Sequence, residues 1–133
     1  MITLFITAQI IFTLNAGVMP ICKDSGYPAL DGCYDGKNKI YISEVTSRPK
    51  DYILYHEIGH SLLNKDYFKG KLKTFSDVET MAWEFSDYVY DYKYNRNTKI
   101  PKKHVKIFQR KCPDKCLKEI IGIPMVEAEQ PLM

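Results

Sequence analysis

The sequence predicts an α+β domain in which a small antiparallel sheet packs on one long helix, with a second helix beside it. The segment Lys39–Ser43 combines β-branched and aromatic residues, which favour a strand. Two later segments, beginning near Ser47 and Ser76, start with helix-capping residues and continue with apolar residues at helical spacing. The chain has 133 residues, which is room for one domain.

The composition excludes several classes of protein. Hydrophobic residues make up 45% of the chain, which is too many for a disordered protein, and seven Gly and seven Pro are too few for a collagen-like or low-complexity chain. The net charge is +3, from 19 Lys and Arg against 16 Asp and Glu. This mild excess favours no particular class of partner.

The N-terminal segment resembles an export signal. Residues 1–21 contain no charged side chain, and the apolar run Met1–Leu14 has the length of a signal-peptide core rather than of a membrane span. We expect residues 1–16 to be a signal peptide, or an N-terminal anchor if residues 1–19 are retained. The domain then spans 17–123 in a secreted, periplasmic or cell-envelope protein. The alternatives are a first strand or helix of the fold and a cytoplasmic location.

Four cysteines bear on the same question. An even number of cysteines in a small exported domain favours disulfides. The simplest pairing joins Cys22 to Cys33 and Cys112 to Cys116. The alternative is a structural zinc site built from all four thiolates, which the wide spacing disfavours.

The elements follow in order along the chain. Gly, Pro, Asp and Ser crowd residues 23–38 and predict turns before the Lys39–Ser43 strand. Ser47 is a candidate cap for a helix that has Pro49 in its first turn and runs to about Asn64. A polar link, 65–74, leads to the next helix.

The second helix is predicted to start at a capping box, Ser76–Glu79, and to reach about Tyr92. Eight Lys and Arg and no acid lie between residues 93 and 111, which is typical of a solvated face. Aromatic residues there are too sparse for a base-stacking surface, so we expect no nucleic-acid binding. A short third helix is predicted over Lys102–Arg110, and a flexible acidic tail over 124–133.

The segment His56–His60 is an H-E-x-x-H motif inside the first predicted helix. Residues four apart lie one turn apart on one helix face, so both imidazoles can reach one Zn²⁺ at about 2.0–2.1 Å. Glu57 is rotated by about 100° from His56 and can address a metal-bound water without occupying a coordination position. The motif therefore predicts a catalytic zinc site with His56 and His60 as ligands and Glu57 as the catalytic base.

A catalytic zinc needs a third protein ligand. Glu79 is the favoured candidate, because two helices packed side by side could bring its carboxylate over the histidine pair; its alternative role is in the capping box. Asp66 stands six residues after His60, where the motif H-E-x-x-H-x-x-G-x-x-H/D has its third ligand. That motif needs a glycine at the turn, and this chain has Leu63 there. Glu84 and His104 are weaker candidates.

Together the strand, the H-E-x-x-H motif and Glu79-x-x-Ala82-x-x-Phe85 resemble the zincin metallopeptidases, most closely the small gluzincins of the ImmA/IrrE-like and minimal groups. The resemblance implies a minimal zincin-like fold, His56, His60 and Glu79 as zinc ligands, and Glu57 as the acid/base that assists peptide hydrolysis. It also implies that the strand through Ile40 is a sheet edge along which an extended peptide or protein substrate pairs.

Other side chains complete this hypothesis. An extra donor to the oxyanion could come from Tyr88, Tyr90 or His104. Asp77, Asp87 or a backbone carbonyl could accept a hydrogen bond from the imidazoles. Two other functions stay open: a zinc-binding but non-hydrolytic regulatory or protein-binding domain, and a basic adaptor that docks anionic surfaces through residues 93–111.

Overall fold

The computed structural model describes residues 2–4, 10–15, 32–34, 39–43, 46, 48–63 and 75–123. Its strands are β1 (Ile2–Leu4), β2 (Ile10–Asn15), β3 (Gly32–Tyr34) and β4 (Lys39–Ser43). Its helices are α1 (Lys50–Leu63), α2 (Phe75–Tyr94), α3 (Lys102–Lys111) and α4 (Asp114–Ile121). Asp66, Cys22 and the tail 124–133 lie outside the described residues.

The strands pair in the order β1-β2-β4-β3. β1 is antiparallel to β2 and β3 is antiparallel to β4, but β2 runs parallel to β4, with Phe12 opposite Ile40 and Leu14 opposite Ile42. β4 is therefore flanked on both sides. The expectation that this strand is an open edge for substrate is wrong, because β2 and β3 already occupy its hydrogen-bonding groups.

The predicted α+β class with a small antiparallel sheet is also wrong. Where the structure describes side chains as well as backbone, 74% of the residues are helical, and β4 is the only strand covered by more than one residue. The central strand pairing is parallel rather than antiparallel. The physical reason is that helices continue beyond residue 100 and supply most of the buried apolar side chains, whereas β4 has only five residues.

The strand Lys39–Ser43 and the three predicted helices are present, with small shifts at their ends. α1 begins at Lys50, and the Pro49 carbonyl accepts the first helical hydrogen bond from the amide of Ile53 at 3.1 Å. α2 begins at Phe75, so Ser76 lies within the helix instead of capping it. α4 was not expected; its eight residues follow Pro113 and bury Cys116, Leu117 and Ile120.

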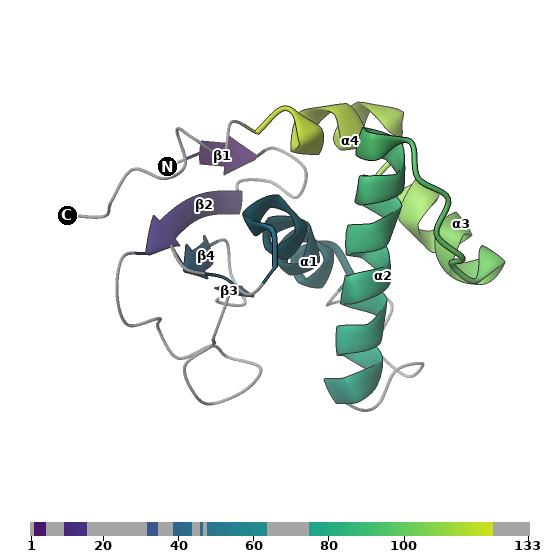
Figure 1. The fold of residues 1–133 in the computed structure, drawn as a ribbon, viewed down its shortest axis with the longest axis horizontal. Coiled ribbons are helices and arrows are strands. Elements are labelled where there is room, and N and C mark those ends of the chain that lie inside the picture. Colours follow the sequence, from purple (N-terminus) through teal and green to yellow (C-terminus); the bar gives the residue numbers. More distant parts are fainter. Residues whose placement is uncertain are drawn as a thin grey trace.

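Helix α1 lies at the centre of the fold. It contacts β3 and β4 on one side and α2 on the other, while α3 and α4 pack against α2 (Figure 1). This position explains why apolar residues occur almost all round α1. The fully buried core combines side chains of β4 and all four helices, among them Ile40, Ile42, Leu54, Ile58, Phe85, Val89, Phe108 and Ile120.

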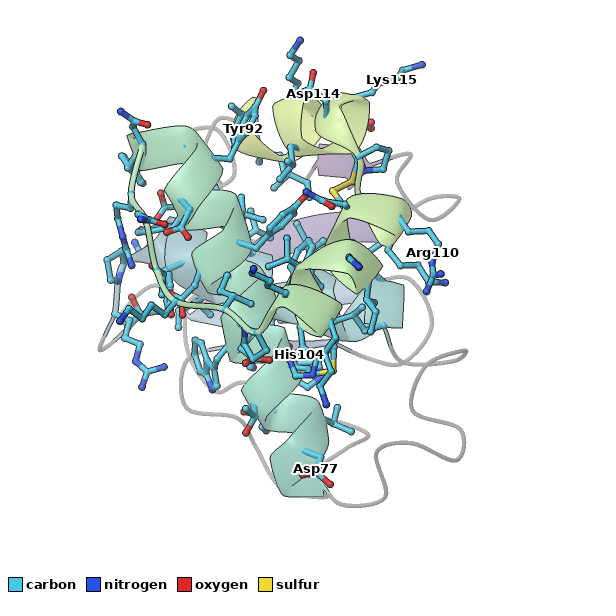
Figure 2. All side chains as sticks on the ribbon, turned by 90° about the vertical axis from the view of Figure 1, so that its right-hand side faces the viewer. Asp77, Tyr92, His104, Arg110, Asp114 and Lys115 are labelled. Atoms are coloured by element: carbon cyan, nitrogen blue, oxygen red, sulfur yellow. A yellow bond between two sulfur atoms is a disulfide. The ribbon has the colours of Figure 1, made fainter. Side chains whose placement is uncertain are left out.

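Helix α3 carries half of the eight basic residues of the stretch 93–111 on its outer face. Lys102, Lys103, Lys106 and Arg110 are exposed, and Phe108 is its buried anchor. Figure 2 shows Arg110 pointing away from the helices behind it. No helix among the described residues is both long and apolar enough to cross a membrane.

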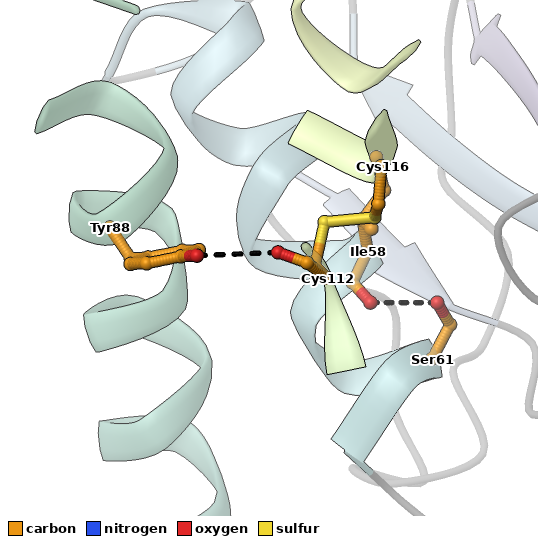
Figure 3. The surroundings of a disulfide bond; sticks show 5 residues. All are labelled: Ile58, Ser61, Tyr88, Cys112 and Cys116. Atoms are coloured by element: carbon orange, nitrogen blue, oxygen red, sulfur yellow. Dashed lines mark hydrogen bonds between the residues drawn. A yellow bond between two sulfur atoms is a disulfide. The ribbon is translucent and has the colours of Figure 1, made fainter. Parts of the chain in front are cut away.

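Cys112 and Cys116 form a disulfide that joins the end of α3 to α4. The Tyr88 hydroxyl of α2 donates a hydrogen bond to the Cys112 carbonyl at 3.2 Å (Figure 3). The second expected pairing, Cys22–Cys33, cannot be followed because Cys22 is outside the described residues. The bridge fixes the short turn that brings α4 back against α2.

Candidate metal centre

Helix α1 places two imidazoles side by side. His56 and His60 are one helical turn apart on the same face, and each is only 3% exposed. Their Nε2 atoms are 3.2 Å apart and their ring centroids 4.7 Å. The two nitrogens therefore point into the same small volume.

Glu79, near the start of α2, reaches this volume from the neighbouring helix. Its Oε1 atom lies 2.6 Å from Nε2 of His60 and 3.2 Å from Nε2 of His56. The Glu79 side chain keeps 28% of its surface exposed. The cluster thus has one open side, formed by the carboxylate.

Gly59, between the two histidines, lets α2 come this close. A Cβ atom at Gly59 would lie 3.1 Å from Cδ2 of Phe85 and 3.3 Å from the carbonyl oxygen of Ala82. These separations are tighter than ordinary van der Waals contact. The missing side chain therefore sets the distance between the helix that carries the histidines and the helix that carries Glu79.

The surroundings set the protonation of the cluster. Burial is the main influence on His56 and lowers its pKa below 6.5, although the hydrogen bond to Glu79 acts in the opposite direction. Burial alone would raise the pKa of Glu79, but the hydrogen bonds with both histidines outweigh it and hold the pKa well below 4.5. A neutral imidazole and an anionic carboxylate are the forms that bind a divalent metal ion.

Glu57 lies beside the cluster. Its side chain is buried, and its Oε2 atom is 3.8 Å from Nε2 of His56. Donor atoms of His56, Glu57 and His60 all lie within 4.8 Å of one another. Glu57 is therefore near the imidazoles, and its carboxylate is farther from His56 than the Glu79 carboxylate is.

Trp83 is a site residue that sequence reasoning missed. Its ring stacks on the imidazole of His56 at a centroid separation of 3.7 Å and an interplanar angle of 25°. The Nδ1 atom of His56 is buried without a hydrogen-bond partner among the described residues. Stacking on Trp83, instead of an acceptor at Nδ1, therefore fixes the orientation of this ring. Trp83 is four residues after Glu79, one helical turn away, which was the available signal.

The competing ligand candidates lie elsewhere. Glu84 and His104 pair with each other across α2 and α3, with Oε1 and Nδ1 2.8 Å apart. Figure 2 shows His104 on α3, and Asp77 in the first turn of α2. Asp77 is exposed, and Asp87 accepts a hydrogen bond from the Tyr52 hydroxyl at 2.8 Å.

The residues considered as oxyanion donors also have other partners. The Tyr88 hydroxyl bonds to the Cys112 carbonyl, and the Tyr90 hydroxyl donates to Asp51. Both hydroxyls therefore donate to groups other than the imidazoles. Among the residues that the structure describes, none of the three candidates is a free hydrogen-bond donor for the oxyanion.

The donor geometry fits a zinc ion. In a tetrahedral site with bonds of about 2.0–2.1 Å, the ligand atoms lie about 3.3 Å from one another. The separations of His56 from His60 and from Glu79 are both 3.2 Å, and only the 2.6 Å contact between His60 and Glu79 must lengthen. Two nitrogens and one carboxylate oxygen are a donor set that zinc favours.

Comparison of the chain with protein-family models, curated proteins and solved structures gives no significant match.

Proposed function

We propose that this chain is a zinc-dependent metallopeptidase in which His56, His60 and Glu79 hold the metal and Glu57 is the general base. The observation that carries the proposal is the convergence of three donor atoms from two helices, with separations of 2.6–3.2 Å. A buried carboxylate stands next to them. These are the parts that peptide hydrolysis by an activated water requires.

A bound zinc ion would lower the pKa of a coordinated water and polarise the carbonyl of the substrate. The protein residues supply the rest. Glu57 accepts the proton of the attacking water and returns it to the leaving amine. Trp83 holds the His56 ring in place, and the apolar surroundings of α1 keep bulk water away from the imidazoles.

The role of Glu57 is tested by comparing Glu57→Gln with the wild type. The variant should still bind one zinc per chain, because Glu57 is not a ligand, while kcat on a mixed peptide library falls by about 10²–10⁴. Glu84→Gln is the matched control, since it makes the same change on α2 and should leave the rate unchanged. If the wild type binds zinc yet is no more active than Glu57→Gln, the non-hydrolytic zinc domain is the correct function.

The ligand set is tested by metal content and affinity. His60→Ala and Glu79→Gln should each lower zinc affinity by at least the 10–100-fold that loss of a supporting residue produces. His104→Ala removes a histidine from the other pair and should leave zinc binding intact. Unchanged zinc affinity in Glu79→Gln would remove Glu79 from the ligand set.

We further propose that the chain functions outside the reducing cytoplasm. The disulfide between Cys112 and Cys116 supports this location, since such bridges persist in secreted and periplasmic proteins. If the apolar segment 1–16 is the export signal, its cleavage removes β1 and β2 and leaves one edge of β4 unpaired. Cleavage after Ala16 leaves Gly17 as the first residue, so a mature chain that N-terminal sequencing shows to begin before Gly17 would contradict it.

A further inference from the structure

An arginine next to the candidate metal centre has no acidic partner among the residues that the structure describes. Arg48 is exposed, and its guanidinium carbon lies 4.1 Å from the centroid of the Trp83 ring. It forms no ion pair with a carboxylate among the described residues. Trp83 in turn stacks on His56, and Tyr52 stacks on Trp83 at 5.5 Å. The arginine is thus attached to the site through a layer of aromatic rings.

Stacking on an indole leaves a guanidinium able to bind anions. The planar group is held over the ring by cation–π attraction, while its N–H donors remain available to a carboxylate in bidentate geometry. The neighbouring acids are otherwise engaged: Asp87 accepts from Tyr52, and Glu79 contacts the two histidines. Arg48 therefore has donors to offer to a ligand that enters the site.

The spacing suits a peptide. The contacts of Trp83, 3.7 Å to His56 and 4.1 Å to Arg48, place the guanidinium within about 8 Å of the imidazole, the length of about two extended residues. Arg48 and the cluster therefore belong to one site.

We infer that Arg48, held in place by Trp83, binds a substrate carboxylate, so that the site prefers peptides with a carboxylate two or three residues from the bond that is cleaved. The position of the carboxylate relative to a cleaved bond rests on the proposed peptidase function, but the binding of the carboxylate does not require hydrolysis. The carboxylate can belong to the peptide C-terminus or to an acidic side chain. Both present the same two oxygens to the guanidinium.

Trp83 provides a direct readout, because it is the only tryptophan in the chain. We would titrate the full chain, without added metal, with acetyl-Ala-Ala-Ala and with its C-terminal amide, and follow tryptophan fluorescence. A second pair, acetyl-Ala-Glu-Ala-amide and acetyl-Ala-Gln-Ala-amide, tests an acidic side chain. The carboxylate member of at least one pair should bind at least tenfold more tightly, and the pair that discriminates identifies the source.

Variants locate the effect. Arg48→Gln should abolish the preference for the carboxylate peptide. Arg48→Lys keeps the positive charge but should retain only part of this preference, because an ammonium cannot make the bidentate contact. Arg110→Gln on α3 is the matched control and should bind both pairs as the wild type does. Equal binding of acid and amide by the wild type, or an unchanged preference in Arg48→Gln, would overturn the inference.

The two proposals can fail separately. A carboxylate preference that depends on Arg48 in a chain that never cleaves peptides would support the binding site and contradict the peptidase. Hydrolysis that depends on Glu57 but shows no preference for acidic or free-carboxylate peptides would support the peptidase and contradict the role of Arg48.

Discussion

Asp51 is a buried acid, 8% exposed, at the start of α1. It accepts hydrogen bonds from the hydroxyls of Tyr90 and Tyr94 and from the ammonium of Lys93 at 3.0 Å. Burial alone would raise the pKa of Asp51, but these donors outweigh it and hold the pKa below 3.8. Lys93 also donates to the Tyr55 hydroxyl at 3.0 Å, so the network ties the start of α1 to the end of α2.

We predict that Asp51→Asn lowers the free energy of unfolding at pH 7 by about 2–3 kcal/mol, because it leaves Lys93 and two tyrosines without their anionic acceptor. A depressed folded-state pKa contributes stability that is present above the ordinary value of 3.8 and is lost as the pH falls through the lower folded value. The difference between wild type and variant should therefore shrink below pH 3.8.

Urea unfolding from pH 7 to pH 2 measures this difference. The control is Asp114→Asn, which removes an exposed acid paired with Lys118 at 3.0 Å and should leave unfolding unchanged. A constant gap between wild type and Asp51→Asn over the whole pH range would show that the Asp51 charge does not stabilise the fold.

Among the elements, the contact of α1 with α2 decides whether a metal site exists. The histidines come from one helix and Glu79 from the other, so their separation depends on how closely the helices pack. Gly59 faces Phe85 and the Ala82 carbonyl at this crossing. The same glycine therefore affects both stability and the geometry of the cluster.

We predict that Gly59→Ala destabilises the protein by about 1 kcal/mol and weakens zinc binding. At an exposed helical position alanine would stabilise by about 1 kcal/mol, but here overpacking against Phe85 costs about 1–3 kcal/mol and displaces α2. Thermal unfolding and zinc titration measure the two effects. Combining Gly59→Ala with Phe85→Leu should recover part of both losses. A more stable Gly59→Ala with normal zinc affinity would mean that the helices do not need this close approach.

The disulfide acts on α3 and α4 only. We predict that replacing Cys112 and Cys116 together by alanine lowers the free energy of unfolding by about 2 kcal/mol, since the bridge closes a loop of only about five residues. Phe108 and Ile120 stay buried in the core, so helix content and zinc binding should not change. Urea unfolding, circular dichroism and metal content test the three statements. Loss of zinc binding would show that α4 supports the metal centre.

For the whole molecule, features that depend on residues close together in the sequence were predicted well, and features that depend on distant residues were not. Local signals located the strand Lys39–Ser43 and three helices to within three residues at each end, because propensity, proline placement and helical periodicity act over a few residues. α4 was missed because eight residues are too few for its periodicity to stand out. The parallel pairing of β2 with β4 was also missed, since it depends on residues far apart in the chain.

The sequence by itself determined that His56 and His60 share a helix face with Glu57 between them, because helical geometry fixes residues four apart. It made Glu79 a candidate but left it competing with Asp66, Glu84 and a capping role. Only the packing of α2 on α1 through Gly59 brings the Glu79 carboxylate to both imidazoles and sets Trp83 and Arg48 beside them. Such contacts between helices depend on side-chain shape across long separations in the chain, which no local pattern encodes.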